Sequence, residues 1–143
     1  MSFEVVSVLT DEARRRTSDM WATGKSFRVV SFVLGNQGHD PSDPTIAIVP
    51  DPTRTDCYGL VFGPKVISGF TNASDFCPVF ECFVDYNEAV DQLSSICLIA
   101  QVVYSPVPGD PDVNTTFLFS ISNFPLRRKT DVEQITFRVG VQR

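Results

Sequence analysis

The side chains that most often carry catalysis are scarce in this chain. Its single histidine, His39, lies in the run Gly-Asn-Gln-Gly-His-Asp-Pro at 35–41, and no Gly-x-Ser-x-Gly, Gly-x-Gly-x-x-Gly, P-loop or His-Glu-x-x-His motif occurs. Nucleophilic hydrolysis needs a nucleophile, a base and an orienting acid, so we interpret His39 as a turn residue. Two carboxylates could converge for glycoside cleavage, but nothing in the sequence singles out a pair. The sequence therefore predicts a protein that is not an enzyme and has no catalytic residues.

The cysteines do not have the spacing of metal ligands. They stand at positions 57, 77, 82 and 97, without a Cys-x-x-Cys pair, and His39 is far from them in sequence. The odd offset between Cys77 and Cys82 would place them on opposite faces of a straight strand. We expect four buried, reduced cysteines that act as small apolar residues, with oxidation outside a reducing compartment as the alternative.

One acidic segment has the first half of a calcium-binding pattern. Asp110, Asp112 and Asn114 have the spacing with which alternate oxygens converge on a hard cation. Thr115 stands where the loop needs glycine, and Ile121 stands where a bidentate glutamate closes the site. We therefore interpret this segment as a turn, and predict no metal and no cofactor.

Composition and charge exclude several classes of protein. The chain has 143 residues, of which 43% are hydrophobic and 20% charged, as is typical of one globular domain over 1–143. The net charge is −5, and the middle of the chain is acidic while both ends are mildly basic. Phosphate neutralisation needs the opposite balance, so nucleic acid is not an expected partner. Without a signal-like start or a run of about 20 apolar residues, we expect no membrane partner and synthesis in a cytosol.

One segment is predicted to be a helix. Thr10 suits the N-cap, Asp11 and Glu12 suit the positive end of the helix dipole, and Gly24 supplies the left-handed position that ends a helix. Helical spacing places several residues on one apolar face, which we expect to join the core. These residues are Ala13, Thr17, Met20 and Trp21.

The remainder of the chain has the pattern of β-strands. Residues 135–142 alternate between apolar and polar, as in an antiparallel sheet with one buried face. Other runs rich in β-branched and aromatic residues are 27–34, 58–67, 76–84, 95–104 and 116–121. Pro64 and Pro78 interrupt two of these runs, so each is expected at an edge or a bulge. The predicted fold class is α+β, with one N-terminal amphipathic helix packed on a mainly antiparallel β-sheet or β-sandwich.

Two proline-rich loops and one basic turn are the candidate binding regions. Residues 35–56 contain four prolines around an apolar patch, and 105–114 contain three. Proline stiffens extended segments, so such loops lose less entropy when they bind. Residues 127–129 are three consecutive basic residues, suited to solvent or to an acidic surface on a neighbouring subunit. The candidate assembly contacts are Asp40, Asp43, Ile46, Ile48, Arg54, Val107, Asp110, Arg127, Arg128 and Lys129.

Several stretches resemble the N-terminal domain of bacteriophage tail-collar fibre proteins. Val-Leu-Thr-Asp-Glu-Ala-Arg at 8–14, then Ala-Thr-Gly-Lys-Ser-Phe at 22–27 and a strand ending in glycine, is similar to the family's helix, Ala-x-Gly-Lys turn and strand. Pro-Asp-Pro-Thr-Arg-Thr at 50–55 is similar to its Pro-Thr-x-Thr motif, and parts of 117–131 look like the closing strands of related tail proteins. The resemblance implies a structural virion protein of a tail or baseplate, made in the host cytoplasm, that acts as a fibre-attachment or adaptor module.

Such a module works by assembly. We expect a homo-oligomer, either a trimer or a hexameric ring, whose partners are copies of itself and other phage tail or baseplate proteins. The alternative is a small β-sandwich that binds a host-surface glycan through exposed aromatic residues, with Trp21, Tyr58, Tyr86 and Tyr104 as candidates. The second alternative is a hydrolase without a recognisable motif.

Overall fold

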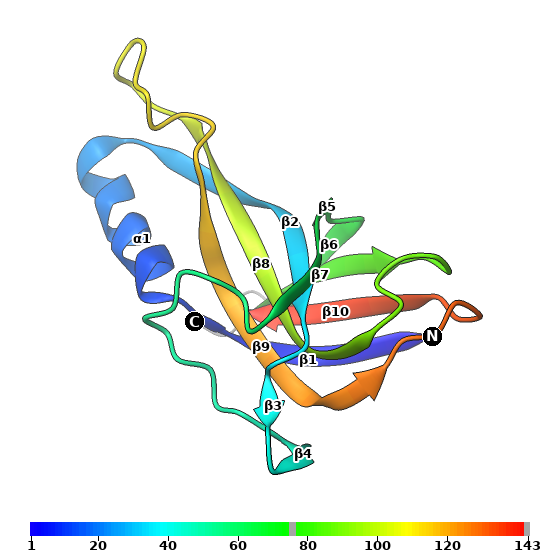
Figure 1. Cartoon of the computed structure of the whole chain (residues 1–143). Coiled ribbons are helices and arrows are strands. Elements are labelled where there is room, and N and C mark those ends of the chain that lie inside the picture. The colour runs from blue at the N-terminus through cyan, green and yellow to red at the C-terminus, as the bar shows by residue number, and fades with distance from the viewer. Residues whose placement is uncertain (75–76, 142–143) are drawn as a thin grey trace.

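A computed structural model of the chain describes residues 1–74 and 77–141, which form one short helix and a curled β-sheet (Figure 1). The chain is therefore broadly α+β, as predicted, and strands dominate it. The elements are β1 (Ser2–Leu9), α1 (Asp11–Thr23), β2 (Ser26–Gly35), β3 (His39–Asp40), β4 (Asp43–Ala47), β5 (Leu60–Val66), β6 (Gly69–Ser74), β7 (Cys77–Val84), β8 (Gln92–Tyr104), β9 (Thr116–Arg128) and β10 (Ile135–Val141). Phe76 and Gln142, which the sequence assigns to strands, lie outside the described residues.

Four strands, β1, β3, β4 and β6, lie outside the runs that the sequence predicts to be strands. The sheet has the order β5-β2-β8-β9-β1-β10-β7-β6, and β3 and β4 form a separate pair. Within it, β1 runs parallel to β10 and antiparallel to β9, whereas the other described pairs are all antiparallel. Both partners of β1 come from the other end of the chain, so its position between them depends on pairing that no local pattern encodes.

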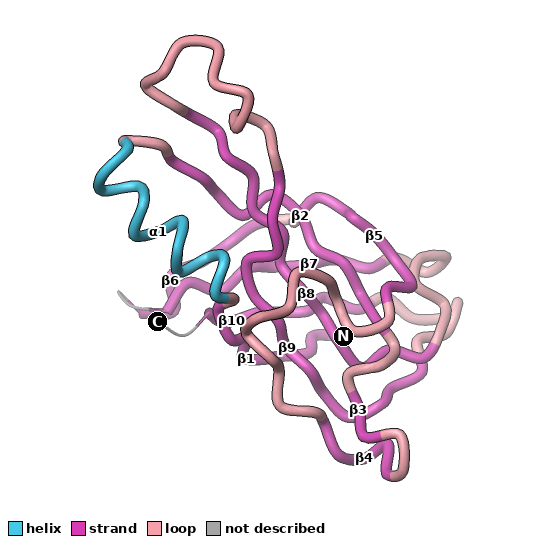
Figure 2. Tube along the Cα trace, turned by 60° about the vertical axis from the view of Figure 1, so that its left-hand side comes forward, coloured by secondary structure: helices cyan, strands magenta, loops and turns pink. Residues whose placement is uncertain are grey.

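The sheet is curled, and its two end strands, β5 and β6, which are labelled on opposite sides of the view in Figure 2, are consecutive in the chain. Only residues 67 and 68 separate β5 from β6. The Ile67 amide donates to the Val30 carbonyl of β2 (3.2 Å), and the Ser68 amide donates to the Glu81 carbonyl of β7 (2.8 Å). This short connection therefore bridges the two halves of the sheet. Pro64 lies in the end strand β5, which confirms the prediction that it marks an edge.

The main hydrophobic core lies inside the curl, and we call it the sealed core. Its buried side chains come from both halves of the sheet, and most of them have no contact with solvent. They include Phe32, Leu34, Ile96 and Leu98 of β2 and β8, and Val84, Ile135, Phe137 and Val139 of β7 and β10. Burying each such side chain contributes roughly 1.5–3 kcal/mol, so this cluster is the main source of stability.

The helix α1 begins and ends where its capping residues predict. Thr10 Oγ1 accepts a hydrogen bond from the Ala13 amide (3.1 Å) and donates one to the Leu118 carbonyl of β9 (2.6 Å). The same side chain thus starts the helix and fixes it to the sheet. Gly24 has a φ of +74°, and its amide donates to the Met20 carbonyl, which closes the last turn.

The apolar face of α1 is only partly covered. Ala13 is buried in a cluster with Ala100, Val102 and Phe117. Trp21 is 88% exposed, so the prediction that it belongs to the core is wrong. The reason is that helical periodicity identifies an apolar face but does not fix how far the sheet extends beneath it; only the first turn of α1 enters a core cluster.

The loop predicted over 35–56 contains the two short strands β3 and β4, and we call residues 36–58 the arm. Its base is closed, because the Asn36 amide donates to the Gly59 carbonyl (3.0 Å) and the Gln37 amide to the Tyr58 carbonyl (3.1 Å). The arm also lies along the outer face of β9, where Asn123 Nδ2 donates to the Ile48 carbonyl (3.0 Å). Figure 1 shows its tip extending away from the sheet at β3 and β4.

Candidate functional site

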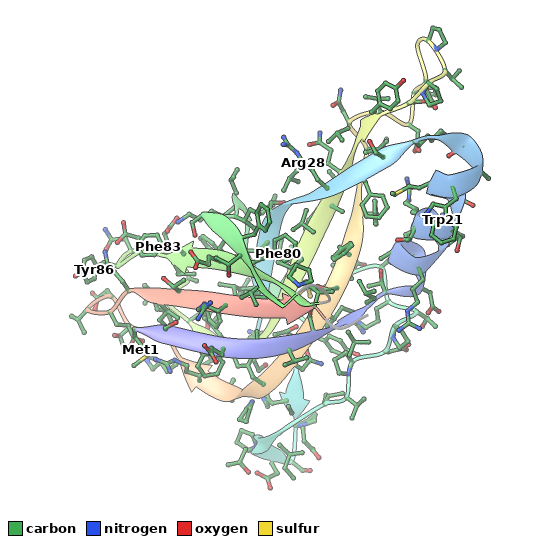
Figure 3. All side chains as sticks on the ribbon, turned by 180° about the vertical axis from the view of Figure 1, so that it is seen from behind. Met1, Trp21, Arg28, Phe80, Phe83 and Tyr86 are labelled. Atoms are coloured by element: carbon green, nitrogen blue, oxygen red, sulfur yellow. The ribbon has the colours of Figure 1, made fainter. Side chains whose placement is uncertain are left out.

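An apolar groove of about 1170 Å³ lies between α1 and the strands β2, β6 and β7. Seen from behind in Figure 3, Trp21 of α1, Arg28 of β2 and Phe80 of β7 lie around this side of the molecule. Besides Trp21, its lining includes Val66, which is 74% exposed, and Phe70, which is 63% exposed. Exposed apolar side chains that gather in one place mark an interaction site more often than scattered ones do.

The groove also contains an open strand edge. β8 pairs with β2 along its whole length, but β5 pairs with β2 only over 31–35. Residues 27–29 of β2 line the groove and have a strand neighbour on one side only, within the part of the chain that the structure describes. An edge of this kind can pair with an extended segment of another chain.

Among the residues that the structure describes, the charged residues that line the groove are both basic. They are Arg14 of α1 and Arg28 of β2, and both side chains are exposed. Among the described residues, neither arginine makes an ion pair. A guanidinium group can bind a carboxylate through two parallel hydrogen bonds, so this rim suits an acidic ligand.

The arm has the properties that complement the groove, namely exposed apolar side chains next to carboxylates. Its apolar residues Ile46 and Val49 are 52% and 84% exposed. Asp40 and Asp43 lie close to the arm tip and are half-exposed, and no lysine or arginine occurs from 29 to 53. The Ser42 amide and hydroxyl donate to Asp40 Oδ1 (2.9 and 2.8 Å), and these bonds lower the pKa of Asp40. The carboxylate is therefore charged and held in place.

Two other predicted contacts hold the base of the arm and do not face outward. Ile48 is half-buried, and its amide donates to the Gly38 carbonyl (2.9 Å). The Arg54 guanidinium lies over the Tyr58 ring, 3.8 Å from its centroid, and donates to the Cys57 carbonyl (3.2 Å). These residues keep the arm in shape.

The second proline-rich loop is the tip of the β8–β9 hairpin. Val107 is exposed there, but the carboxylate of Asp110 is occupied within the chain, since Ser105 Oγ donates to it (2.7 Å) and Lys25 Nζ pairs with it (3.1 Å). The Asp112 amide donates to the same carboxylate, and these contacts lower the pKa of Asp110 to about 2. This arrangement fixes the hairpin against the end of α1 by a network of hydrogen bonds and ion pairs.

The three basic residues at 127–129 do not form one surface. Arg128 is exposed, whereas Arg127 is half-buried and pairs with Glu133 (3.5 Å). Lys129 is fully buried, and its Nζ donates to the carbonyls of Asp85 (2.8 Å), Tyr86 (3.1 Å) and Thr130 (2.8 Å). The interpretation of Lys129 as a solvated or partner-binding residue is therefore wrong. It is a structural residue that satisfies the carbonyls of two turns.

The histidine is paired with a serine. His39 Nδ1 lies 3.0 Å from Ser94 Oγ, and the Gly38 amide donates to the same oxygen (2.8 Å). Ser94 is fully buried, so its hydroxyl cannot reach a substrate. Across residues 1–74 and 77–141, no three His, Cys, Asp or Glu side chains converge in a way that would hold a metal ion.

The aromatic candidates for glycan contact are dispersed. Tyr58 is occupied in the arm, where its hydroxyl accepts from the Asp51 amide (2.9 Å). Tyr86 and Tyr104 are exposed but lie on the turn after β7 and at the end of β8. Trp21 is the one of the four that lines the groove.

Comparisons with family models, with curated proteins and with solved structures each find no significant match to this chain. None of the helical residues described forms a segment long and apolar enough to cross a membrane. The groove and the arm are therefore the features of this chain that bear on its function.

The groove is the feature that the sequence did not reveal. Its lining comes mainly from α1, β2, β5, β6 and β7, with one residue each from β1, β8, β9 and β10. The predicted contacts Asp40, Asp43 and Ile46 lie on the arm instead. The sequence contains a partial indication of the groove. Ala13, in the first turn of α1, is small enough to pack close to the sheet, whereas Trp21 is a large residue near the other end of the helix and need not be buried with it. Nothing local indicates that β5 leaves part of β2 uncovered.

Proposed function

We propose that this chain is a structural assembly module in which the arm of one copy docks in the groove of the next. The observation that carries the proposal is the complementarity between two surfaces of the same molecule. The groove is apolar with Arg14 and Arg28 at its rim, and the arm presents Ile46 and Val49 beside carboxylates. The strand β4 at the arm tip is already extended and is suited to the open edge of β2.

A contact of this kind joins two different surfaces, so it is heterologous. Heterologous contacts repeat from copy to copy and give a closed ring or a filament. A ring agrees with the homo-oligomer expected from the sequence. The resemblance to tail-collar fibre proteins suggests the setting, and we propose a bacteriophage tail or baseplate with an adaptor role for the module. Mass spectrometry of purified phage particles tests this proposal. The chain should be present in a fixed number of copies per particle.

The assembly contact is tested with three identical substitutions at exposed valines. Val66→Ser alters the groove, Val49→Ser alters the arm, and Val132→Ser is the matched control, since Val132 is 80% exposed on the turn before β10. Burial of one valine is worth about 1.5 kcal/mol or more, so each of the first two variants weakens self-association about tenfold or more. The control associates as the wild type does. Sedimentation equilibrium measures all four proteins, and a wild type that stays monomeric at high concentration rules out the proposal.

The exposure of Trp21 favours a second candidate function, recognition of a glycan. Sugar rings pack on exposed aromatic faces, and Trp21 offers such a face in the groove. Glycan-array binding by the purified chain, lost in Trp21→Ala and retained in Tyr86→Ala, would support this candidate over assembly. If no glycan binds, the candidate is excluded.

A further inference from the structure

Two cysteines that the proposed function does not use face each other beneath the arm. Cys57 closes the base of the arm and Cys97 lies in β8, and their Sγ atoms are 2.9 Å apart. Both are buried in a small cluster with Val33, Leu118 and Ile121. A disulfide requires a sulfur–sulfur distance of about 2.05 Å, so the two atoms need to approach by about 0.9 Å to bond.

The two thiols are electronically different. Burial raises the pKa of Cys97, which therefore keeps its proton and donates it in a hydrogen bond to Cys57 Sγ. That bond is the main cause of the lowered pKa of Cys57. Cys82 is a third described cysteine, alone in the sealed core, and burial raises its pKa to about 12. Cys57 is thus the best nucleophile of the three described thiols.

We propose that Cys57 and Cys97 are a covalent modification site that a peroxide converts to a disulfide. The Cys57 thiolate attacks one oxygen of hydrogen peroxide and becomes a sulfenic acid, with release of hydroxide. Cys97 then loses its proton and attacks Cys57 Sγ, which displaces the second hydroxide and forms the sulfur–sulfur bond. Two thiols are oxidised, one peroxide is reduced and two waters result. A small oxidant suits the site, because Cys57 is only 7% exposed.

The bond would tie the base of the arm to the middle of the sheet. Cys57 and Cys97 are 40 positions apart in the chain, so the crosslink restricts a long loop in the unfolded state. We expect the melting temperature to rise by roughly 5–10 °C on oxidation and to return to its first value with a reductant. This inference does not depend on the assembly proposal, because the thiols lie inside one copy.

The test combines mass spectrometry with thermal unfolding of the full chain. After brief treatment with dilute hydrogen peroxide, the wild type is expected to lose two hydrogens and to have two fewer alkylatable thiols in denaturant. Cleavage after Arg54, Lys65 and Glu88 separates the cysteine peptides, so the crosslinked pair can be identified. Cys82→Ser is the matched control and should gain the same thermal stability as the wild type. Cys97→Ser should gain none and should stop at a sulfenic acid on Cys57.

The outcomes are distinct. A crosslink between positions 57 and 97 in the wild type and in Cys82→Ser supports the site. A crosslink that includes position 77 or 82, or two alkylatable thiols at 57 and 97 after oxidation, overturns it. If a serine variant fails to fold, peptide mapping of the wild type alone still decides between these results.

Discussion

The sealed core and the groove contain similar apolar side chains, but these differ in their exposure to solvent. Phe137 in the sealed core is fully buried, whereas Phe70 in the groove is 63% exposed. The core is enclosed because the two halves of the curled sheet face each other. The groove is open because α1 covers the sheet only at its first turn and β5 covers only part of β2. The core therefore stabilises the fold, whereas the exposed side chains of the groove contribute less to stability and are the ones that we propose bind a partner.

The largest effect should come from removing one aromatic ring from each region. Phe137→Ala should lower the free energy of unfolding by about 3–5 kcal/mol, because it leaves a cavity in close-packed surroundings. Phe70→Ala should lower it by less than about 1 kcal/mol, since most of the ring is in water already. Urea unfolding measures both. Equal losses of unfolding free energy in the two variants would show that the groove residues stabilise the fold as much as the core residues do, and would contradict the difference proposed between the two regions.

The second prediction compares two neighbouring basic residues. Lys129→Met leaves three carbonyls without their donor, which should cost about 2–3 kcal/mol. Arg128→Met removes an exposed charge and should change stability by less than about 0.5 kcal/mol. The same unfolding experiment compares them. A stable Lys129→Met protein would contradict the structural role of the buried ammonium group.

The third prediction concerns the charge at the groove rim. The double variant Arg14→Glu and Arg28→Glu should weaken self-association about tenfold at low ionic strength, with a smaller difference at 0.5 M salt, because salt screens exposed charges. Arg128→Glu, which reverses an exposed charge outside the groove, should associate normally. An equal loss in Arg128→Glu would show that the contact involves the basic residues at the end of β9 instead of the groove.

The smallest effect should appear at acid pH. Hydrogen bonds from the Asp112 amide and Ser105, with the Lys25 ammonium, lower the pKa of Asp110 from 3.8 to about 2. A depressed folded-state pKa stabilises the protein above the unfolded value, and that contribution is lost as the pH falls from about 4 to about 2. Asp110→Asn should therefore flatten the decline of melting temperature in this window. A decline as steep as that of the wild type would exclude Asp110 as its source.

The sequence predicts those elements whose cause is local. Thr10 and Gly24 mark the ends of α1 because capping involves neighbouring residues, and the alternation over 135–141 predicts β10 because its period is a property of the strand itself. The pairing of β1 with β9 and β10 and the burial of Lys129 depend on residues far away in the chain, so no local pattern indicates them. The same holds for the exposure of Trp21, which depends on where the sheet ends.

Of the candidate site, the arm was predicted and the groove was not. Prolines and aspartates mark the arm within about 22 residues of sequence, which is an unusual length for a loop in a compact domain. The groove exists only because α1, β2, β6 and β7 meet in space. Sequence reasoning therefore found one half of the proposed contact, and its complement needed the structure.

Docking of the arm in the groove can be tested by mixing two variants, each altered in one of the two surfaces. Val66→Ser with Phe70→Ser removes the groove contact, and Ile46→Ser with Val49→Ser removes the arm contact. We expect each double variant to be a monomer alone, and an equimolar mixture to sediment as a dimer that grows no further. A mixture that remains monomeric, or a double variant that assembles by itself as the wild type does, would contradict it.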